Sequence, residues 1–382
     1  FFKYYNFFVE NLNVLFVTLF GYHLDWVTMN IILPVGISFY TFQALSYTID
    51  VYQKKLPATH DSIEFFAYIS FFPQLVAGPI ERATNLLPQF QKNRYFDYAK
   101  AVDGCRQMLW GFLKKIVIAD NCAWYVNLEW ADYARQNGST LVLTAFLFAI
   151  QIYCDFSGYS DIAIGTARLF GFTLRENFKT PYFSRSVAEF WKRWHISLNT
   201  WFVDYVYIPL GGSREGKVRT ILNTFSIFLL SGLWHGASWA FIAWGGLHAL
   251  YLSFGAMRRK LFAKERPDGR MAKVLSIVVV NLGAVLAWVF FRAGTLRNAE
   301  VYFKAMFRCR FSTSLMALCA GLGPMQFGFC LVAVLLLLLS YIAPPDCHLK
   351  TTPGRFAFVL LCVAAIVFLG MPSGGEFIYF RF

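Results

Sequence analysis

The feature that most constrains this chain is residues 220–257, a stretch that contains no Asp, Glu, Lys or Arg. A helix needs about 20 mostly apolar residues to cross a bilayer, so this stretch is long enough for nearly two crossings. The composition agrees, since 57% of the residues are hydrophobic and 15% are charged, far more apolar than a soluble domain of this length requires. The stretch therefore predicts two membrane helices that turn back on each other.

Seven further runs are uncharged or almost uncharged, and the length rule then gives about nine or ten spans. The predicted fold is all-α: a polytopic membrane helix bundle of about nine or ten spans, with amphipathic helices at the interface, around a central cavity. No internal repeat or linker is visible, so residues 1–382 are predicted to form one domain. The seven runs are residues 11–24, 26–49, 65–80, 139–154, 274–291, 326–343 and 356–370.

Basic side chains cluster between these apolar runs and give a formal charge of +13, from 35 basic and 22 acidic residues. Loops that face the cytoplasmic leaflet have this character, and residues 258–273, with seven basic and two acidic side chains, are predicted to lie there. Residues 292–310 are also basic, although a single span separates the two segments. Two basic segments on either side of a single span would be explained if residues 296–306 formed an amphipathic helix in the plane of the membrane. Apolar residues recur there at helical spacing, as such a helix requires.

The basic charge is predicted to meet membrane lipid rather than nucleic acid, because no soluble domain is present to carry a basic face. The eight cysteines include no C-x-x-C pair, and only the adjacent Cys347 and His348 approach a metal-binding pattern. Neither a metal site nor a disulfide framework is therefore expected. The chain opens on Phe1 instead of Met and begins with an apolar segment, so it is expected to lack N-terminal sequence.

Residues 170–219 differ from the spans because they are rich in aromatic side chains and also dense in charge. Ser186 and Glu189 form a possible capping box that opens a helix over residues 186–205. Aromatic residues recur in it every three or four positions, which predicts an amphipathic, interfacial or re-entrant element with one buried face. Pro209 and the two glycines after Leu210 would end it. Functional residues are expected where this segment meets the spans.

Among the six histidines, His235 stands near the middle of the uncharged stretch. A titratable side chain at that depth is costly unless it faces a cavity in the protein, so its position makes His235 a functional candidate. Gly232 and Gly236 on either side would permit close backbone approach or a break in the helix. The alternative is a core histidine that donates to a backbone carbonyl. His248, further along the stretch, is predicted to be structural.

Two other polar groupings could take part in a site. Asp155 and Asp161 end an apolar run, and they either line a site or mark a solvated helix end. Residues 211–218 nearly match a phosphate-binding loop, but the last position is Val, which lacks the hydroxyl that binds magnesium, so an NTPase is not expected. Arg214 and Lys217 could still hold the phosphates of a nucleotide-like donor, although such cations are more often interfacial charges.

Five motifs follow one another along the chain: Phe-Pro-Gln-Leu-Val-Ala-Gly-Pro-Ile at 72–80, Cys-Asp-Phe-Ser-Gly-Tyr-Ser-Asp at 154–161, Glu-Phe-Trp-Lys-Arg-Trp-His-Ile-Ser-Leu at 189–198, Tyr-Ile-Pro-Leu-Gly-Gly at 207–212 and Leu-Trp-His-Gly-Ala at 233–237. Together they resemble the membrane-bound O-acyltransferase family, and within it the bacterial alginate O-acetyltransferase type. The resemblance extends to Phe-Ile-Tyr-Phe at 377–380, and the members of the family that it resembles have further spans at the start.

The resemblance implies a multi-pass protein of the bacterial inner (plasma) membrane that transfers an acetyl group from a thioester, such as acetyl-CoA, with no bound cofactor. By this resemblance His235 matches the catalytic histidine, assigned here as general base, and His195 matches a second functional histidine. The acceptor would be a hydroxyl of a cell-envelope or secreted polysaccharide, or an extracytoplasmic acetyltransferase that modifies it. Residues expected to line the substrate or donor site are Trp234, Asp155, Ser157, Asp161, Trp194, Arg193, Asn199, Arg214 and Lys217.

Two other functions remain open at this point. The first is acyl transfer of the D-alanyl-teichoic-acid type, which the proline-glycine motif at 207–212 and the acidic motif at 154–161 favour less. The second is a transporter that exports acyl groups to an extracytoplasmic acetyltransferase, with buried histidines as proton relays. Transporters of this kind usually contain repeated halves with paired broken helices, and the sequence contains none.

Overall fold

The structure is a computed structural model, which describes residues 3–26, 28–29, 34–262, 269–308, 324–342, 352–371 and 377–378. Within these ranges every regular element is helical, which confirms the predicted all-α class. Residues 263–268 of the predicted cytoplasmic loop lie outside them, as do Cys309, Cys319, Cys347, His348 and residues 379–380. The elements are α1 (Tyr5–Phe20), α2 (Ile37–Tyr52), α3 (Ser62–Ile69), α4 (Ala83–Gln91), α5 (Tyr98–Phe112), η1 (Leu113–Ala119), α6 (Asp120–Ala131), α7 (Gly138–Leu169), η2 (Pro181–Phe183), α8 (Val187–Arg193), α9 (Ile196–Phe202), η3 (Val203–Tyr207), α10 (Gly216–His235), α11 (Trp239–Phe262), α12 (Arg270–Ala293), α13 (Leu296–Met306), α15 (Pro324–Ile342) and α17 (Thr352–Leu369).

The longest of these helices, α7, packs lengthwise against α5, and paired glycines make the contact close. A Cβ atom added at Gly165 would lie 2.4 Å from the carbonyl oxygen of Gly104, and one added at Gly111 would lie 2.7 Å from the carbonyl oxygen of Gly158. No side chain fits at such distances, so the two backbones touch, as small residues allow in membrane helix pairs. The π-helical segment η1 continues α5 along the same side of α7.

The uncharged stretch folds into two helices, α10 and α11, that turn back on each other, which confirms the predicted hairpin. Of the two, α11 is among the described helices long and apolar enough to cross a membrane and α10 is not, so the prediction of two spans is not confirmed. A Cβ atom added at Gly232 would lie 2.3 Å from the carbonyl oxygen of Phe241, and one added at Gly245 would lie 2.1 Å from that of Phe228. The close backbone approach expected at Gly232 is therefore confirmed. This tight hairpin places His235, the last residue of α10, at its turn.

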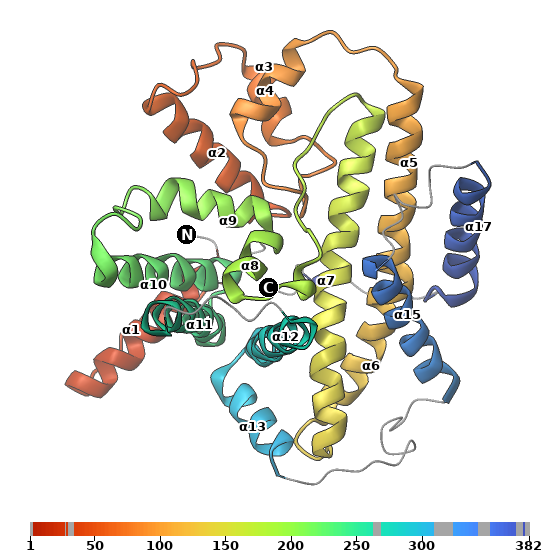
Figure 1. Ribbon diagram of the computed structural model, residues 1–382. Coiled ribbons are helices and arrows are strands. Elements are labelled where there is room, and N and C mark those ends of the chain that lie inside the picture. Colours follow the sequence, from red (N-terminus) through yellow and green to blue (C-terminus); the bar gives the residue numbers. More distant parts are fainter. Residues whose placement is uncertain are drawn as a thin grey trace.

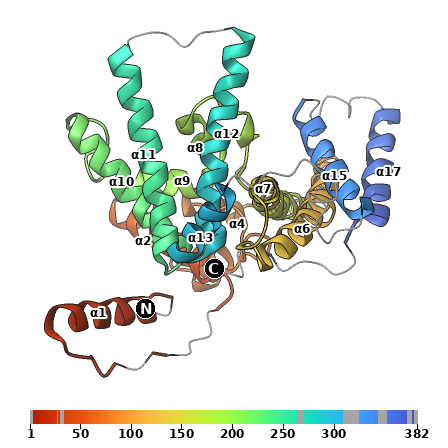
Figure 2. The same cartoon turned by 90° about the horizontal axis from the view of Figure 1, so that it is seen from below.

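Within the described residues, three helices are long and apolar enough to cross a membrane, at Gly138–Leu169, Trp239–Arg258 and Arg270–Ala293, so the predicted count of nine or ten spans is not confirmed. They do not form a parallel bundle. In Figure 1, α11 and α12 are seen nearly end-on, whereas α7 lies in the plane of the view. In Figure 2, α7 is seen nearly end-on, whereas α11 and α12 lie in the plane of the view. In the apolar 18-residue window of each helix, 78% of the residues are buried in α7 and 33% in each of the other two, so α7 forms the centre of the protein.

One predicted span, residues 65–80, is wrong. Helix α3 ends at Ile69, and the chain then passes through turns that contain Pro73 and Pro79. Proline lacks the backbone N–H that a helix interior needs and restricts the residue before it, so the helix cannot continue. The segment instead folds into the core, where Ala77 and Ile80 are 0% and 1% exposed.

The continuous helix predicted over residues 186–205 is also wrong, although its buried aromatic face is confirmed. The Ser186 hydroxyl accepts from the Glu189 N–H at 3.1 Å, as a capping box requires, but the Glu189 carboxylate reaches back to the N–H of Arg185. The helix stops after α8, because His195 adopts a φ of +43°, and it resumes as α9. The buried aromatic face consists of Phe190, Trp191, Trp194, Leu198, Trp201 and Phe202.

The amphipathic helix predicted over residues 296–306 is confirmed as α13. Its buried side includes Ala299, Tyr302 and Met306, and the Tyr302 hydroxyl donates to the carbonyl oxygen of Leu141 at 2.7 Å. This hydrogen bond fixes α13 across the start of α7. Its placement in the plane of a membrane remains a prediction.

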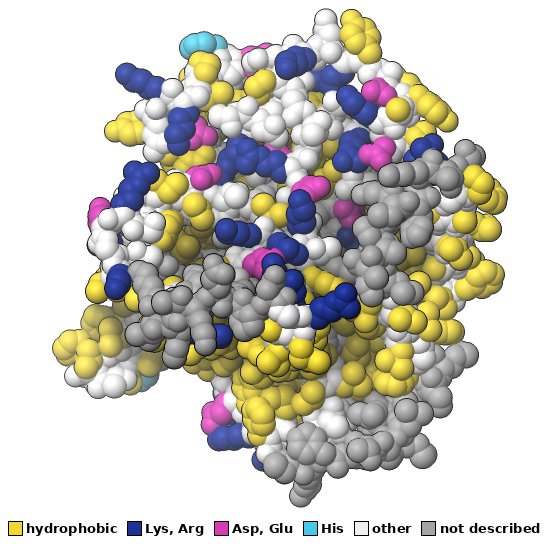
Figure 3. Space-filling model, in the orientation of Figure 1, with side chains coloured by type: hydrophobic (Ala, Val, Ile, Leu, Met, Phe, Trp, Pro, Cys, Tyr) yellow, Lys and Arg dark blue, Asp and Glu magenta, His cyan; other side chains and the backbone are white. Residues whose placement is uncertain are grey.

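The surface in Figure 3 is divided. Lys and Arg side chains, interleaved with Asp and Glu, gather over its upper and central part, whereas hydrophobic side chains line the lower and right-hand rim, towards α13, α15 and α17. Figure 2 shows that the C-terminal end of α11 and the N-terminal end of α12 point to this same face. The basic side chains therefore share a face with the helix ends that flank residues 263–268.

Candidate active site

His195 lies at the break between α8 and α9 and is 1% exposed. Its ring meets Phe156 of α7 edge-on, with 4.6 Å between ring centroids, and also contacts Phe178 and Trp234. A residue other than glycine at this positive φ costs of order 1–3 kcal/mol, and such conformations persist only where the surroundings enforce them. Strain of this kind is concentrated at functional sites, which makes His195 a candidate on structural grounds as well.

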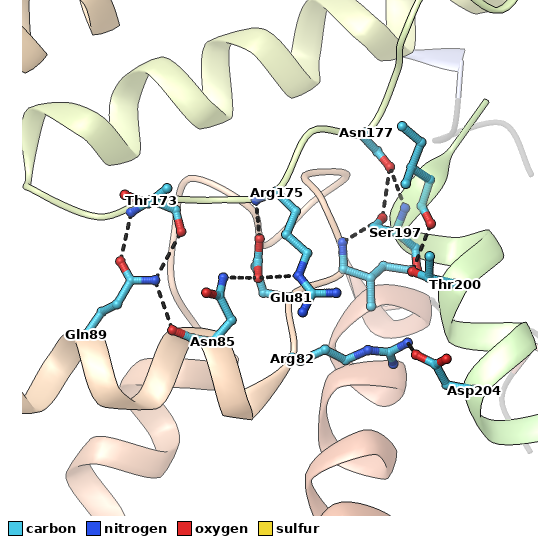
Figure 4. Close-up of polar contacts among 12 residues, drawn as sticks. Glu81, Arg82, Asn85, Gln89, Thr173, Arg175, Asn177, Ser197, Thr200 and Asp204 are labelled. Carbon is cyan, nitrogen blue, oxygen red and sulfur yellow. Dashed lines mark hydrogen bonds and ion pairs between the residues drawn. The ribbon is translucent and has the colours of Figure 1, made fainter. Parts of the chain in front are cut away.

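The segment before α8 holds the backbone that follows His195, and Figure 4 shows the side chain of Asn177 directed at Ser197. The carbonyl oxygen of Asn177 accepts from the Ile196 N–H at 2.9 Å, and its side-chain oxygen accepts from the N–H and the hydroxyl of Ser197, at 3.3 and 2.8 Å. The same side-chain oxygen lies 3.1 Å from Nδ1 of His195. The Ser197 hydroxyl in turn accepts from the N–H of Ile80 at 3.0 Å, which ties in the motif at residues 72–80.

Further polar contacts fix the loop that follows this motif (Figure 4). The fully buried Glu81 carboxylate accepts from the Arg175 N–H at 2.5 Å and from the Asn85 amide at 2.7 Å. Arg82 forms an ion pair with Asp204 of η3 at 3.1 Å. The loop is thus tied both to the segment before α8 and to the element after α9, so it supports the position of His195 from two sides.

His235 is 6% exposed and its imidazole is surrounded by aromatic rings. Ring centroids lie 4.8 Å away for Trp234, 5.1 Å for Trp244 and 5.2 Å for Phe291. Trp234 also contacts His195, with 6.3 Å between centroids. The structure therefore brings the two predicted catalytic histidines, which come from different segments, into contact with the same tryptophan, Trp234.

A small, partly open pocket with a cavity volume of about 20 Å³ lies between α8–α9 and α10. Its lining is mostly apolar with a few polar groups, as in many ligand sites. His235 stands one turn of α10 beyond Ser231, the last lining residue of that helix, and does not border the pocket. The lining residues are Trp191, His195, Leu198, Asn199, Phe202, Ile227, Phe228 and Ser231.

The other predicted lining residues of this region take different positions. Asn199 borders the pocket and donates to the carbonyl oxygen of Trp191 at 2.8 Å. Trp194 is buried but packs away from the pocket, stacked on Phe190 with 5.5 Å between centroids. Arg193 pairs with Glu189 on the partly exposed side of α8, at 2.7 Å. Asn199 is therefore the residue of this group that can touch a ligand in the pocket.

Asp155, Ser157 and Asp161 lie well inside α7, which continues to Leu169, so their interpretation as a solvated helix end is wrong. Lys115 lies 2.8 Å from Asp155 and 2.7 Å from Asp120, while Lys114 donates to Ser157 at 3.1 Å and forms an ion pair with Asp161. Because each charge in this group has an opposite partner, it has the character of a structural network. We call it the η1–α7 charge cluster: Lys114, Lys115, Asp120, Asp155, Ser157 and Asp161.

Arg214 and Lys217 are exposed at the opposite end of α10 from His235. The helix rises about 1.5 Å per residue, so Lys217 and His235 are separated by about 27 Å along its axis. The structure therefore does not bring these two cations to the pocket. Their proposed contact with donor phosphates would need a donor that extends along α10.

His248 is buried on α11, where its Nδ1 accepts from Nε1 of Trp191 at 3.4 Å. It also packs against Trp244, which contacts His235 on its other side. These contacts suit the structural role predicted for it. Among the described residues, no group of three His, Cys, Asp or Glu side chains could hold a metal ion.

Four polar residues near these sites were not predicted from the sequence. Lys114 and Lys115 stand next to an apolar run, and this placement could have suggested a buried ion pair. Asn177 sits within a charged segment and has no spacing that marks it. Lys3 donates to the backbone oxygens of Trp234 and His235, at 2.8 and 3.1 Å, and so satisfies the C-terminal end of α10. A contact across 231 positions leaves no trace in local sequence.

Comparison with known proteins identifies the family. The sequence model of the membrane-bound O-acyltransferase family matches residues 54–296, which is more than half of the chain. The chain belongs to the membrane-bound O-acyltransferase family. This membrane-bound O-acyltransferase is 45% identical over 311 residues to the probable alginate O-acetylase AlgI of Pseudomonas aeruginosa, a match that covers 80% of the chain and 57% of the relative.

Two other curated relatives show the range of the family. The peptidoglycan O-acetyltransferase of Helicobacter pylori is 36% identical over 337 residues, covering 80% of this chain and 62% of the relative. The teichoic acid D-alanyltransferase of Bacillus subtilis is 29% identical over 265 residues, covering 65% of this chain and 66% of the relative. The chain therefore spans about 57–62% of the length of the two O-acetylating relatives.

Proposed function

We propose that this membrane-bound O-acyltransferase transfers an acetyl or other short acyl group from a thioester donor toward hydroxyls of a cell-envelope or secreted polysaccharide. The observation that carries the proposal is the pair of buried histidines, His195 and His235, that meet the same Trp234 beside an apolar pocket. Relatives named for O-acetylation of alginate and peptidoglycan support the polysaccharide acceptor. The D-alanyltransferase is less similar, so D-alanyl transfer is the second candidate.

In the proposed reaction, the acceptor oxygen attacks the thioester carbonyl while a neutral imidazole takes the hydroxyl proton. The new C–O bond forms, the C–S bond breaks, and the thiol leaves with that proton. We assign the base to His235, a role that typically contributes about 10²–10⁴-fold. His195 orients the acceptor or holds the other substrate in place. The surrounding rings would keep water from the thioester and so limit its hydrolysis.

The proposed setting is the bacterial inner membrane, with a single multi-pass domain around this site. The basic face in Figure 3 supports a cytoplasmic assignment for that side, because positive side chains favour the cytoplasmic leaflet. An acyl thioester such as acetyl-CoA would reach the site from there. The acceptor is either the polymer or an extracytoplasmic acetyltransferase that passes the group on.

Two measurements test this function. Deletion of the gene should remove O-acetyl groups from the envelope or secreted polysaccharide, and the gene in trans should restore them; unchanged acetyl content would contradict the proposal. In the same samples, release of D-alanine by mild base distinguishes the D-alanyl reaction. A transporter that only exports acyl groups would behave differently in two assays. In vesicles it would move label from a thioester across the membrane, and in detergent it would form no ester on any acceptor.

A further inference from the structure

The side chain of Asn177 occupies a position that determines where His195 carries its proton. Its oxygen receives a hydrogen bond from the backbone N–H of Ser197, and its nitrogen donates to the Ser160 hydroxyl at 3.2 Å. A backbone N–H can only donate, so the atom that faces it is the amide oxygen. The Ser197 hydroxyl accepts from Ile80 and is therefore free to donate its own proton to the same oxygen.

This assignment fixes which atom is the donor in the 3.1 Å contact between this oxygen and Nδ1 of His195. An amide oxygen only accepts, so Nδ1 must be the donor and carry the proton. The ring is neutral, because it is buried among Phe156, Phe178 and Trp234, and no carboxylate of the described residues contacts it to offset a charge. A neutral ring with its proton on Nδ1 keeps a lone pair on Nε2.

Nε2 of His195 is buried and forms no hydrogen bond with any residue in the described ranges. A buried acceptor without a partner is costly, and most such groups in proteins are satisfied. The ring that carries this atom borders the pocket, next to Asn199 and Leu198. A ligand that donates a hydrogen bond would satisfy Nε2, whereas one that only accepts would not.

We infer that Asn177 is a positioning residue that holds the proton of His195 on Nδ1, so that Nε2 accepts a hydrogen bond from a hydroxyl of the acyl acceptor other than the attacking one, whose proton passes to His235. The identity of that ligand rests on the proposed function, but the tautomer does not. Seen from α10, the titratable neighbour is His235, whose ring also contacts Trp234; from α7, His195 faces Phe156, which does not titrate. Asn177 acts on the reaction only through His195.

The tautomer can be measured directly. Nitrogen NMR of the detergent-purified chain labelled with ¹⁵N-histidine should show one neutral ring protonated on Nδ1, and this signal should be absent from His195→Gln. Asn177→Leu, of similar size, should move the His195 signal to the other tautomer or to a mixture. A wild-type His195 protonated on Nε2 would overturn the inference, whether or not the protein transfers acyl groups.

Activity adds a second measurement. Asn177→Leu should lower transfer at least tenfold at every pH, whereas Asn177→Asp, which still accepts from Nδ1, should retain transfer at high pH. Its carboxylate favours the protonated imidazolium, so the low-pH limb of its activity should move to higher pH. An Asn177→Asp profile identical to that of wild type, or full activity in Asn177→Leu, would contradict the positioning role.

Asn223→Leu is a matched control for a lost buried amide. Asn223 donates to the carbonyl oxygens of Leu210 and Gly212, at the end of α10 away from His235. This variant should lower the amount of protein but leave the His195 tautomer unchanged. If the wild-type tautomer is as inferred while the polysaccharide carries no acetyl groups, the proposed function fails and the role of Asn177 stands.

Discussion

The molecule contains two buried polar regions of opposite character, the η1–α7 charge cluster and the pair of histidines around Trp234. In the cluster, Lys114 and Lys115 each meet a carboxylate, and the carboxylate of Asp155 also accepts from the backbone N–H of Ile378 at 2.7 Å. At the histidines the surroundings are aromatic, and Nε2 of His195 meets no partner among the described residues. The first region satisfies its own charges, whereas the second retains the capacity to bind.

The presence or absence of internal partners distinguishes these two regions more clearly than how deeply their titratable groups are buried or which residue types they contain. Both regions place titratable groups in an apolar helical protein, where each is expensive unless paired or facing a cavity. A group whose partners are all internal stabilises the fold. One with an open hydrogen-bonding position is available to a substrate only where a ligand can reach it: Nε2 of His248 also has no partner among the described residues, but His248 does not border the pocket as His195 does.

The largest expected effect is on acyl transfer. His195→Ala should lower transfer by about 10²–10⁴-fold, the range for a side chain that transfers a proton or positions the group whose proton is transferred. The amount of folded, membrane-inserted protein should stay near that of wild type. O-acetyl content of the polysaccharide, normalised to membrane protein level, is the measurement, and near-normal acetylation in His195→Ala would place the chemistry elsewhere.

The reverse pattern is expected at the charge cluster. Lys114→Ala leaves the half-buried Asp161 and the buried Ser157 beside an empty position, and the loss of one partner of a buried ion pair costs about 3–5 kcal/mol. Thermal unfolding in detergent should therefore show a large loss of stability. Replacing both Lys114 and Asp161 by Leu should recover part of it, because no uncompensated charge remains. Loss of transfer in Lys114→Ala at unchanged stability would contradict the comparison.

A smaller effect tests the aromatic layer that supports both histidines. Trp194→Asp places a charge against Phe190 and Trp288 and should lower the yield of folded protein severalfold. Lys192→Gln, two residues earlier and exposed, should leave the yield unchanged. The comparison is made by fluorescence-detected size-exclusion chromatography, and equal yields from the two variants would refute the buried aromatic face.

The smallest effect is expected at the exposed end of α10. Arg214→Gln and Lys217→Gln change neither the pocket nor the charge cluster, and surface substitutions of this kind usually alter stability by about 0.5 kcal/mol or less. The KM for the acyl donor should change less than about twofold. A rise of tenfold or more would show that these cations hold the donor, as the near match to a phosphate-binding loop suggested.

The sequence predicted those features that follow from local patterns. The hairpin of α10 and α11 could be predicted because charge is absent over its whole length, and α13 because its apolar residues recur at helical spacing. The aromatic face of residues 186–205 was visible for the same reason. His235 could be singled out because a titratable residue deep in such a stretch is unusual.

Features that depend on long-range contacts could not be predicted. The break at His195 depends on Asn177 and Ile80, which replace the hydrogen bonds of a continuous helix with bonds to a distant segment. The predicted span at residues 65–80 failed because proline outweighed hydropathy. Asp155 was misinterpreted because its lysine partner lies forty positions earlier, on η1.

One measurement tests the central claim most directly: O-acetyl content and protein stability determined side by side for His235→Ala and Lys114→Ala at equal membrane protein level. His235→Ala should be folded and inserted with a melting temperature close to that of wild type, and should transfer no measurable acetyl groups. Lys114→Ala should melt at a much lower temperature, with transfer reduced only in proportion to the folded protein. A folded His235→Ala protein that acetylates the polysaccharide normally would contradict the assignment of this site.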